Sequence, residues 1–162
     1  MNTVKYISAI STIGALLLLL QACAAVTSAG QKLGLLPINP LATVHIAAAA
    51  DANQSSVTQL DLVWVLSATA LGQLPKSGPQ WFAAKAALLA GRPADLLVLP
   101  LQVPVGSAQQ DLGLPKGHDK AVAVLVYANH LAAAGQPVAT ITSFKCLLIE
   151  VQASTINYLS CP

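Results

Sequence analysis

Alternation of apolar and polar positions predicts two neighbouring strands in the first half of the chain. They lie at Leu41–Ala50 and Val57–Leu66, and the polar stretch Asp51–Ser56 between them has the composition of a turn or loop. The apolar residues that share a parity are Val44, Ile46 and Ala48 in the first stretch and Leu60, Leu62, Trp64 and Leu66 in the second. Because side chains alternate between the two faces of a strand, each set is expected to face a core, with Trp64 between two sheets.

Four further stretches are predicted as strands in the second half of the chain. They are Asp95–Val105, Ala121–Ala128, Val138–Val151 and Ile156–Cys161. Prolines interrupt the first, and because proline lacks the N–H that a strand donates, this strand is expected to lie at a sheet edge or to be irregular. The second is continuously apolar, as a central strand would be. Val138–Val151 is predicted as one long strand that pairs with Ile156–Cys161.

One stretch has a clear helical period. In residues 80–90, Trp81, Ala84 and Leu88 recur at the spacing of one helix face, and Gly91 predicts the end of the helix. A helix inserted among strands predicts a mainly β fold, a β-sandwich with one short helical insertion. Abundant Ala and Leu leave an all-α fold as the alternative, against which the clustering of Val and Ile argues.

Residues 1–22 have the order of regions found in a secretory signal peptide. A short polar start with Lys5 leads into the almost purely apolar Ile7–Leu20, which is too short to cross a hydrocarbon core as a helix. The run Leu20-Gln21-Ala22-Cys23 resembles the lipidation motif of bacterial lipoproteins. Cys23 is therefore the expected acylated residue and the first residue of the mature chain.

Acylation of Cys23 predicts attachment to a membrane surface, because two or more acyl chains anchor a protein stably. Ala24 stands where an acidic residue would favour the inner membrane, so we expect the outer membrane, facing the periplasm. The predicted organisation is a signal peptide over 1–22, a lipidated tether over 23–40 and a β-sandwich domain over 41–162.

Cys146 and Cys161 remain after lipidation, and in the oxidising periplasm they are expected to form a disulfide. The alternative is two free thiols. A metal site is a poor explanation, because the two cysteines show neither CxxC spacing nor a histidine nearby in the sequence.

Charge and composition exclude two broad classes. Charged residues make up 9% of the chain and hydrophobic residues 55%, where about 25% charged is usual. Intrinsic disorder is excluded, because disordered chains combine low hydrophobicity with high net charge. A net charge of +2 without a Lys/Arg cluster excludes a nucleic-acid partner, which needs a basic surface for phosphates.

The sequence also lacks recognisable catalytic motifs. It contains no GxSxG, no HExxH and no glycine-rich phosphate loop, and its six acidic residues are scattered. His45 falls in a strand, where a packed histidine is the simplest interpretation, and His118 and His130 lack a third ligand. We therefore expect no enzyme activity, no metal and no cofactor.

Three sets of residues along the chain follow one another in an order known from a protein family. They are Ala49-Ala50-Asp51-Ala52-Asn53 before Val57–Leu66, Trp81-Phe82 at the helix start, and Leu148-Ile149-Glu150-Val151 before Ile156-Asn157-Tyr158-Leu159. This order of elements, which covers most of residues 41–159, resembles that of the lipoproteins of the TssJ (VasD) family of type VI secretion systems. Where family members often have a Gly-Arg-Pro-Ser-type stretch and a Tyr-Gln-Leu strand end, this chain has Gln54-Ser55-Ser56 and Trp64-Val65-Leu66.

The resemblance implies a transthyretin-like sandwich that tethers the membrane core complex of the secretion system to the outer membrane. It implies loop contacts to the inner-membrane component, including the loop between the first two strands. By position, the partner-binding residues would be Asp51, Asn53, Gln54 and Ser55. Two alternatives are a pilotin-like lipoprotein, which would carry a secretin to the outer membrane, and a periplasmic ligand-binding lipoprotein.

Overall fold

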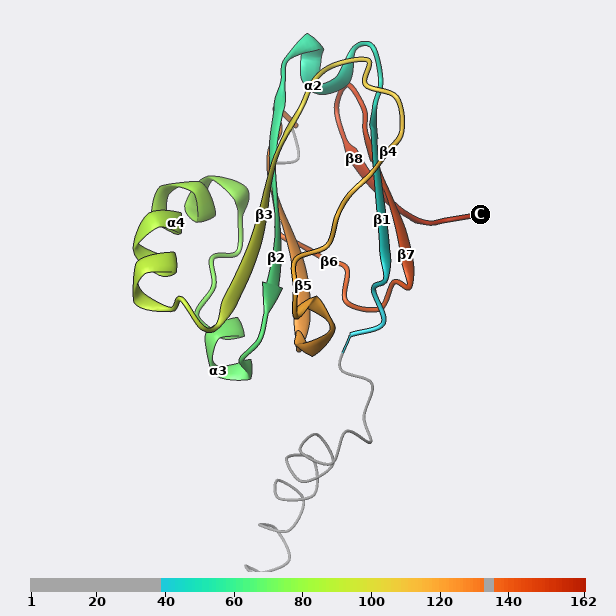
Figure 1. Cartoon of the computed structure of the whole chain (residues 1–162). Coiled ribbons are helices and arrows are strands. Elements are labelled where there is room, and N and C mark those ends of the chain that lie inside the picture. Colours follow the sequence, from blue (N-terminus) through green and yellow to red (C-terminus); the bar gives the residue numbers. More distant parts are fainter. Residues whose placement is uncertain (1–38, 133–135) are drawn as a thin grey trace, which may run out of the picture. The chain divides into compact units, whose positions relative to one another are not determined.

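Two four-stranded sheets face each other in the computed structural model, which describes residues 39–132 and 136–162. Figure 1 shows the sheets edge-on, with helix α4 outside one of them. The β1 sheet has the order β4-β1-β7-β8 and the β2 sheet the order β3-β2-β5-β6. The strands are β1 Thr43–Ala48, β2 Thr58–Val65, β3 Leu96–Val103, β4 Gln110–Asp111, β5 Ala123–Asn129, β6 Ala139–Thr140, β7 Cys146–Val151 and β8 Ile156–Ser160.

Four short or medium helices connect these strands. They are α2 Ala52–Ser55, α3 Ala68–Leu71, α4 Gly78–Gly91 and the 3-10 turn η1 His118–Lys120. The predicted β-sandwich with a helical insertion is confirmed, and the all-α alternative is wrong. The predicted signal peptide 1–22, Cys23 and all but the last two residues of the predicted tether 23–40 lie outside the described residues.

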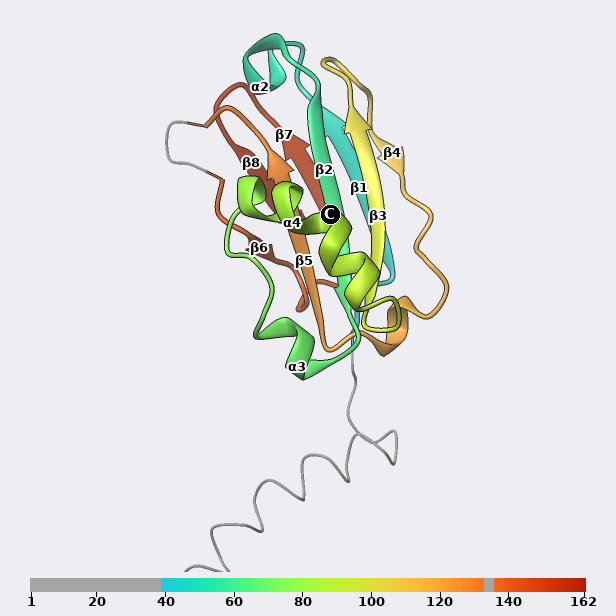
Figure 2. The ribbon, with the colours of Figure 1, turned by 90° about the vertical axis from the view of Figure 1, so that its left-hand side faces the viewer.

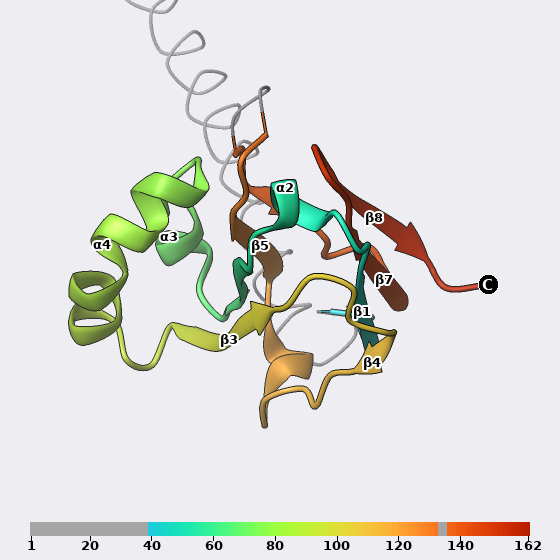
Figure 3. The ribbon, with the colours of Figure 1, turned by 90° about the horizontal axis from the view of Figure 1, so that it is seen from above.

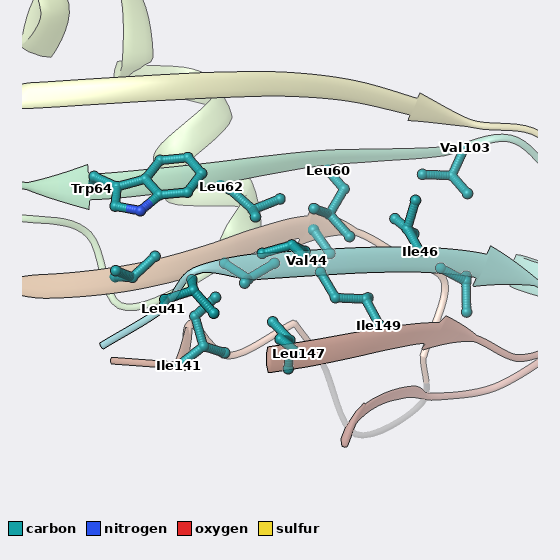
Figure 4. Close-up of a cluster of buried hydrophobic side chains, with 14 of the residues drawn as sticks. Leu41, Val44, Ile46, Leu60, Leu62, Trp64, Val103, Ile141, Leu147 and Ile149 are labelled. Atoms are coloured by element: carbon teal, nitrogen blue, oxygen red, sulfur yellow. The ribbon is translucent and has the colours of Figure 1, made fainter. Parts of the chain in front are cut away.

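The core between the sheets is built by strand alternation, as Figure 4 shows. Val44 and Ile46 of β1 lie opposite Leu60, Leu62 and Trp64 of β2, and all are buried. The predicted position of Trp64 between two sheets is thus confirmed. Burying such side chains stabilises the fold by about 1.5–3 kcal/mol each.

The second face of the β2 sheet is also covered, by helix α4 (Figures 2 and 3). The Trp81 ring stacks on Tyr127 of β5 with 4.6 Å between ring centroids. The Trp81 indole N–H donates to the fully buried Asp61 of β2 at 2.7 Å, and the Lys85 ammonium lies 2.7 Å from the same carboxylate oxygen. A buried ion pair therefore joins the helix to the sheet.

The two predicted sheet positions in the second half are confirmed. β3 pairs only with β2 and forms an edge, with Pro100 opposite Asp61. β5 lies between β2 and β6 in the middle of its sheet. An edge strand tolerates proline because its outward N–H positions have no partner to lose.

The prediction of one long strand over Val138–Val151 is wrong, because this segment passes from one sheet to the other. β6 pairs with β5, whereas β7 lies between β1 and β8. The Thr142 side-chain oxygen accepts from the Val124 N–H, and the Phe144 N–H donates to the Ile141 carbonyl, which closes a turn. Apolar residues on both sides of the mostly polar residues 142–145 hide such a crossing, since both sheets bury the residues they receive.

Two connections between the main elements contain short elements. The connection between β2 and α4 includes α3, where the Ser67 side chain caps the helix by accepting from the Ala70 N–H. The long connection before β5 includes β4 and η1. No helix in the described residues is long and apolar enough to cross a membrane.

Cys146 and Cys161 form a disulfide in the structure, with their Cα atoms 5.4 Å apart. It joins the first residue of β7 to the residue after β8, at the open end of this hairpin. Replacing both cysteines by serine is expected to lower the free energy of unfolding by about 3 kcal/mol, because a loop of this length is then free in the unfolded chain. Urea unfolding measures the change, and a loss below about 1 kcal/mol would contradict this assignment.

Candidate functional site

The polar stretch between β1 and β2 is a constrained turn. Asn53, Gln54 and Ser55 all have positive φ, at 49°, 54° and 61°. This left-handed conformation costs roughly 1–2 kcal/mol for each residue that is not glycine. Such strain persists only where surrounding contacts fix the backbone, and it is found at functional sites more often than elsewhere.

Hydrogen bonds from two other segments hold this turn. The Asn53 and Gln54 N–H groups donate to the carbonyls of Gln152 and Ala153, in the turn between β7 and β8. The Asn53 side-chain oxygen accepts from the Leu131 N–H at 2.6 Å, and the Gln54 side-chain amide donates to the Leu131 carbonyl at 2.9 Å. The turn is therefore fixed to the chain after β5 as well as to the β7–β8 turn.

These contacts correct one part of the sequence-based site. Asn53 is only 2% exposed, and its side chain also donates to the Val57 carbonyl. It holds the turn together and is not free to contact a partner. Of the four predicted partner-binding residues, the other three, Asp51, Gln54 and Ser55, are exposed and can present side chains outward.

We call this end of the sandwich the loop end: the α2 turn with its flanking residues 49–57, the segment after β3 (104–107), the segment after β5 (130–132) and the β7–β8 turn (152–155). Figure 1 shows α2 at this end, opposite the point where the described chain begins. The segment after β3 belongs to it because the Gly106 N–H donates to the Ala49 carbonyl at 2.8 Å.

Exposed apolar side chains gather at the loop end. Four large apolar side chains are exposed in the described residues, and three of them lie here: Val57 at 56%, Leu131 at 52% and Val105 at 38%. The fourth, Leu159, is on β8. Single exposed apolar residues are ordinary, but a group beside a rigid polar turn is typical of a protein contact surface. None of the three was predicted from the sequence as a contact residue, although an apolar residue next to a polar turn was a usable signal.

A pocket of about 190 Å³ adjoins the loop end. Its lining comes from the end of β5 and the segment after it, from residues 136–137, and from the β7–β8 turn with β8, and it includes His130, Gln136, Thr155 and Tyr158. His130 is only 2% exposed, and its Nε2 lies 3.0 Å from the Gln152 carbonyl. Burial raises the pKa of Tyr158 to about 12, so its phenol stays neutral at physiological pH.

The other histidines have separate surroundings. His45 contacts Asp111 at 2.5 Å, and a ring nitrogen lies within 4.8 Å of both disulfide sulfurs. Among the described residues this is the one group of three side chains close enough to share an ion, and its sulfurs are bonded to each other. His118 contacts the Pro115 carbonyl, within its own turn. The predicted strand position of His45 is confirmed.

Structural comparison identifies the fold. No protein-family model matches the chain, and no curated protein matches its sequence. The solved structure of Serratia marcescens Lip, a membrane-bound component of the type VI secretion system, is similar with a TM-score of 0.53 and 11% identity, over 74% of this chain and 96% of that one. The solved structure of the type VI secretion lipoprotein TssJ1 from Pseudomonas aeruginosa is similar with a TM-score of 0.49 and 16% identity, over 74% of this chain and 95% of that one.

The similarity to Lip assigns a fold class. The chain has the two-sheet fold of that secretion-system lipoprotein, which confirms the TssJ-like fold predicted by the sequence resemblance. The match takes in nearly all of Lip, so the shared part is a whole domain.

Proposed function

We propose that this chain is an outer-membrane lipoprotein of a type VI secretion system, and that its loop end docks the inner-membrane component of the membrane complex. The observation that carries this proposal is the group of exposed apolar residues Val57, Val105 and Leu131 around a fixed polar turn. The fold shared with Lip supports the same class of assembly.

Rigidity of the turn favours this role. A partner that binds a preformed surface orders few side chains, so less of the interaction free energy is lost on association. The hydrogen bonds of Asn53 fix the turn before any partner arrives. The surface then presents the exposed apolar side chains beside the exposed polar side chains of Asp51, Gln54 and Ser55, a mixture that is common in protein interfaces.

Substitution of the exposed apolar residues tests the docking role. Changing Val57 and Leu131 together to serine is expected to weaken capture of the inner-membrane component at least about tenfold, because burying a Val or Leu side chain contributes about 1.5–3 kcal/mol and about 1.4 kcal/mol is a tenfold change in affinity. Co-purification from cells and binding of the purified proteins both measure this. Asn53 is left unchanged, since losing its buried hydrogen bonds would confuse folding with binding.

Leu159→Ser is the matched control, because Leu159 is similarly exposed at 43% but lies on β8. All three exposed changes should alter stability by less than about 0.5 kcal/mol. Equal loss of capture in the control, or full capture by the double variant, would contradict the proposal. Changing Asp51 and Ser55 to alanine should have a smaller effect, because truncating these two short polar side chains removes little apolar surface from the contact.

Lipidation of Cys23 is the second part of the proposal, and it rests on the signal-like residues 1–22 and the run Leu20-Gln21-Ala22-Cys23. Cys23→Ser is expected to move the protein from the membrane fraction to the soluble fraction of the periplasm, because the acyl chains supply the anchoring free energy. Fractionation and labelling with palmitate measure this. Equal palmitate incorporation into the variant would show that Cys23 is not the lipidated residue.

A further inference from the structure

We infer that three lysines at the end of the sandwich opposite the loop end contact anionic phospholipid headgroups of the membrane that holds the anchor. They are Lys116, Lys120 and Lys145, and all three are exposed. The contact turns the loop end away from the membrane, where a partner can reach it. Since it presupposes an anchor, it rests on the proposed lipidation of Cys23, and it adds a contact that the folded domain makes itself.

The three lysines come from two segments that meet where the described chain begins. We call this place the anchor end: residues 39–42, the segment 115–121 around η1 and the turn 141–145 before β7. The Asn39 side-chain amide donates to the His118 carbonyl at 3.1 Å, and the Ala42 N–H donates to the Lys145 carbonyl at 2.8 Å. Figures 1 and 2 show the start of the described chain at the opposite end from α2.

The lysine charges at the anchor end are not neutralised by ion pairs. The ion pairs of the described residues lie elsewhere, between β1 and β4 and between β2 and α4. Asp119 is the one carboxylate side chain in the three segments, and it is exposed too. Arg92 and Asp95, between α4 and β3, add one charge of each sign. Three lysines and one aspartate therefore leave two net positive charges at the anchor end.

The loop end has the opposite polarity. It contains no lysine or arginine, and Asp51 is its one acidic residue. An anionic surface therefore attracts the anchor end and gives no attraction to the loop end. The uneven distribution of charge orients the domain, with the exposed apolar residues of the loop end on the side away from the lipid.

The length of chain before the described residues favours a membrane as the partner of these lysines. Asn39 follows Cys23 by 16 positions, and whatever its conformation, a segment of this length reaches at most about 55 Å. Acylation of Cys23 would thus keep the lysines near the lipid surface, and the contact becomes an intramolecular step. Lysines are point charges on flexible stems, which suits a fluid layer of headgroups that has no fixed shape.

The size of the effect follows from the net charge. Each lysine or arginine near an anionic membrane favours contact by about fivefold, and this attraction falls off within about 8–10 Å at physiological salt. Two net charges should therefore favour contact with an anionic surface over a neutral one by about twentyfold. Such a preference orients a domain that is already tethered and is too weak to recruit a free one.

The first experiment measures which end of the domain lies at the lipid. The purified lipoprotein is inserted into nanodiscs of phosphatidylcholine alone, or of an equal mixture with phosphatidylglycerol, each with a trace of lipid that carries gadolinium on its headgroup. In the anionic discs, NMR line broadening at the anchor end should rise at least about fivefold, the effect of one net charge, whereas the loop end should change little. Equal broadening at the anchor end in both discs would overturn the inference.

Variants then assign the effect to the lysines. The triple change of Lys116, Lys120 and Lys145 to glutamine should abolish the response to phosphatidylglycerol. Lys76→Gln is the matched control, because Lys76 is also exposed but lies between α3 and α4, where its carbonyl accepts from the Val138 N–H. Asp119→Asn should enhance the response, since it raises the net charge. A triple variant that keeps the response, or a control that loses it equally, would contradict the assignment.

Two further measurements separate this inference from the proposals on which it depends. Mass spectrometry of the purified protein shows whether Cys23 is acylated, and if it is not, the lipidation proposal fails and the membrane contact falls with it. In detergent solution, the triple lysine variant should capture the inner-membrane component like the parent chain. If it loses capture there and still responds to phosphatidylglycerol in the discs, the lysines contact an acidic protein, and the inference is wrong while lipidation stands.

Discussion

Replacing Lys85 by methionine is expected to lower the free energy of unfolding by about 3 kcal/mol, because it leaves the Asp61 carboxylate buried without a counter-charge. Asp61 is fully buried, and one of its oxygens has no partner in the described residues. The Trp81 N–H would be its remaining donor. The expected loss is at the low end for a broken buried pair, since the Lys85 side chain is 25% exposed. Chemical unfolding measures it.

The double variant Asp61→Asn with Lys85→Met is the matched control. It removes both charges and keeps an oxygen that can accept from Trp81, so most of the lost stability should return. A Lys85→Met variant that loses less than about 1 kcal/mol would show that the pair behaves as an exposed one. A double variant less stable than the single one would show that the ion pair itself, and not the unpaired charge, governs this contact.

Replacing Gly78 by alanine is expected to destabilise the protein by about 4 kcal/mol, more than most single substitutions. Gly78 is buried at the start of α4, and a Cβ atom there would lie 2.0 Å from the Ala128 carbonyl oxygen. This neighbour is backbone, so it cannot rotate away, and the helix must shift from the sheet. The melting temperature and the yield of folded protein should both fall.

Gly91→Ala is the control at the other end of the same helix. A Cβ atom at Gly91 meets nothing within 4 Å. Alanine there should stabilise the protein by about 0.4–1 kcal/mol, because it restricts the unfolded chain and suits a helix. Similar losses at Gly78 and Gly91 would mean that helix α4 does not approach β5 as closely as the structure shows.

The sequence predicts strand faces well because alternation follows directly from strand geometry. The parity of Leu60, Leu62 and Trp64 is enough to place them in the core between the sheets. It does not reveal what Asp61 does on the opposite face, since its partners Trp81 and Lys85 come from a helix about 20 residues later. A charged residue within an apolar strand indicates a buried partner without identifying it.

The candidate site was only partly predictable for a related reason. The polar composition of Asp51–Ser56 gave its position, but composition does not show which polar side chain turns inward. Asn53 is buried because Leu131, far along the chain, donates to it. Likewise the pocket exists only where His130, Gln136 and β8 meet. Contacts between distant segments decide both features, and no local pattern encodes them.

Under the proposed function, in which the loop end docks a partner and Cys23 carries the anchor, the position of the disulfide would have a mechanical consequence. The described chain begins at Asn39, opposite the loop end, and continues into β1, which runs parallel to β7 (Figure 1). A pull between anchor and partner would act along these strands. It would load the hydrogen bonds between the strands all together, in shear, whereas a pull across the strands would break them one at a time. Thr43 lies beside Cys146, so the load enters β7 where Cys146 is bonded to Cys161. The bond prevents β7 from sliding past β8, and force is passed to two strands at once.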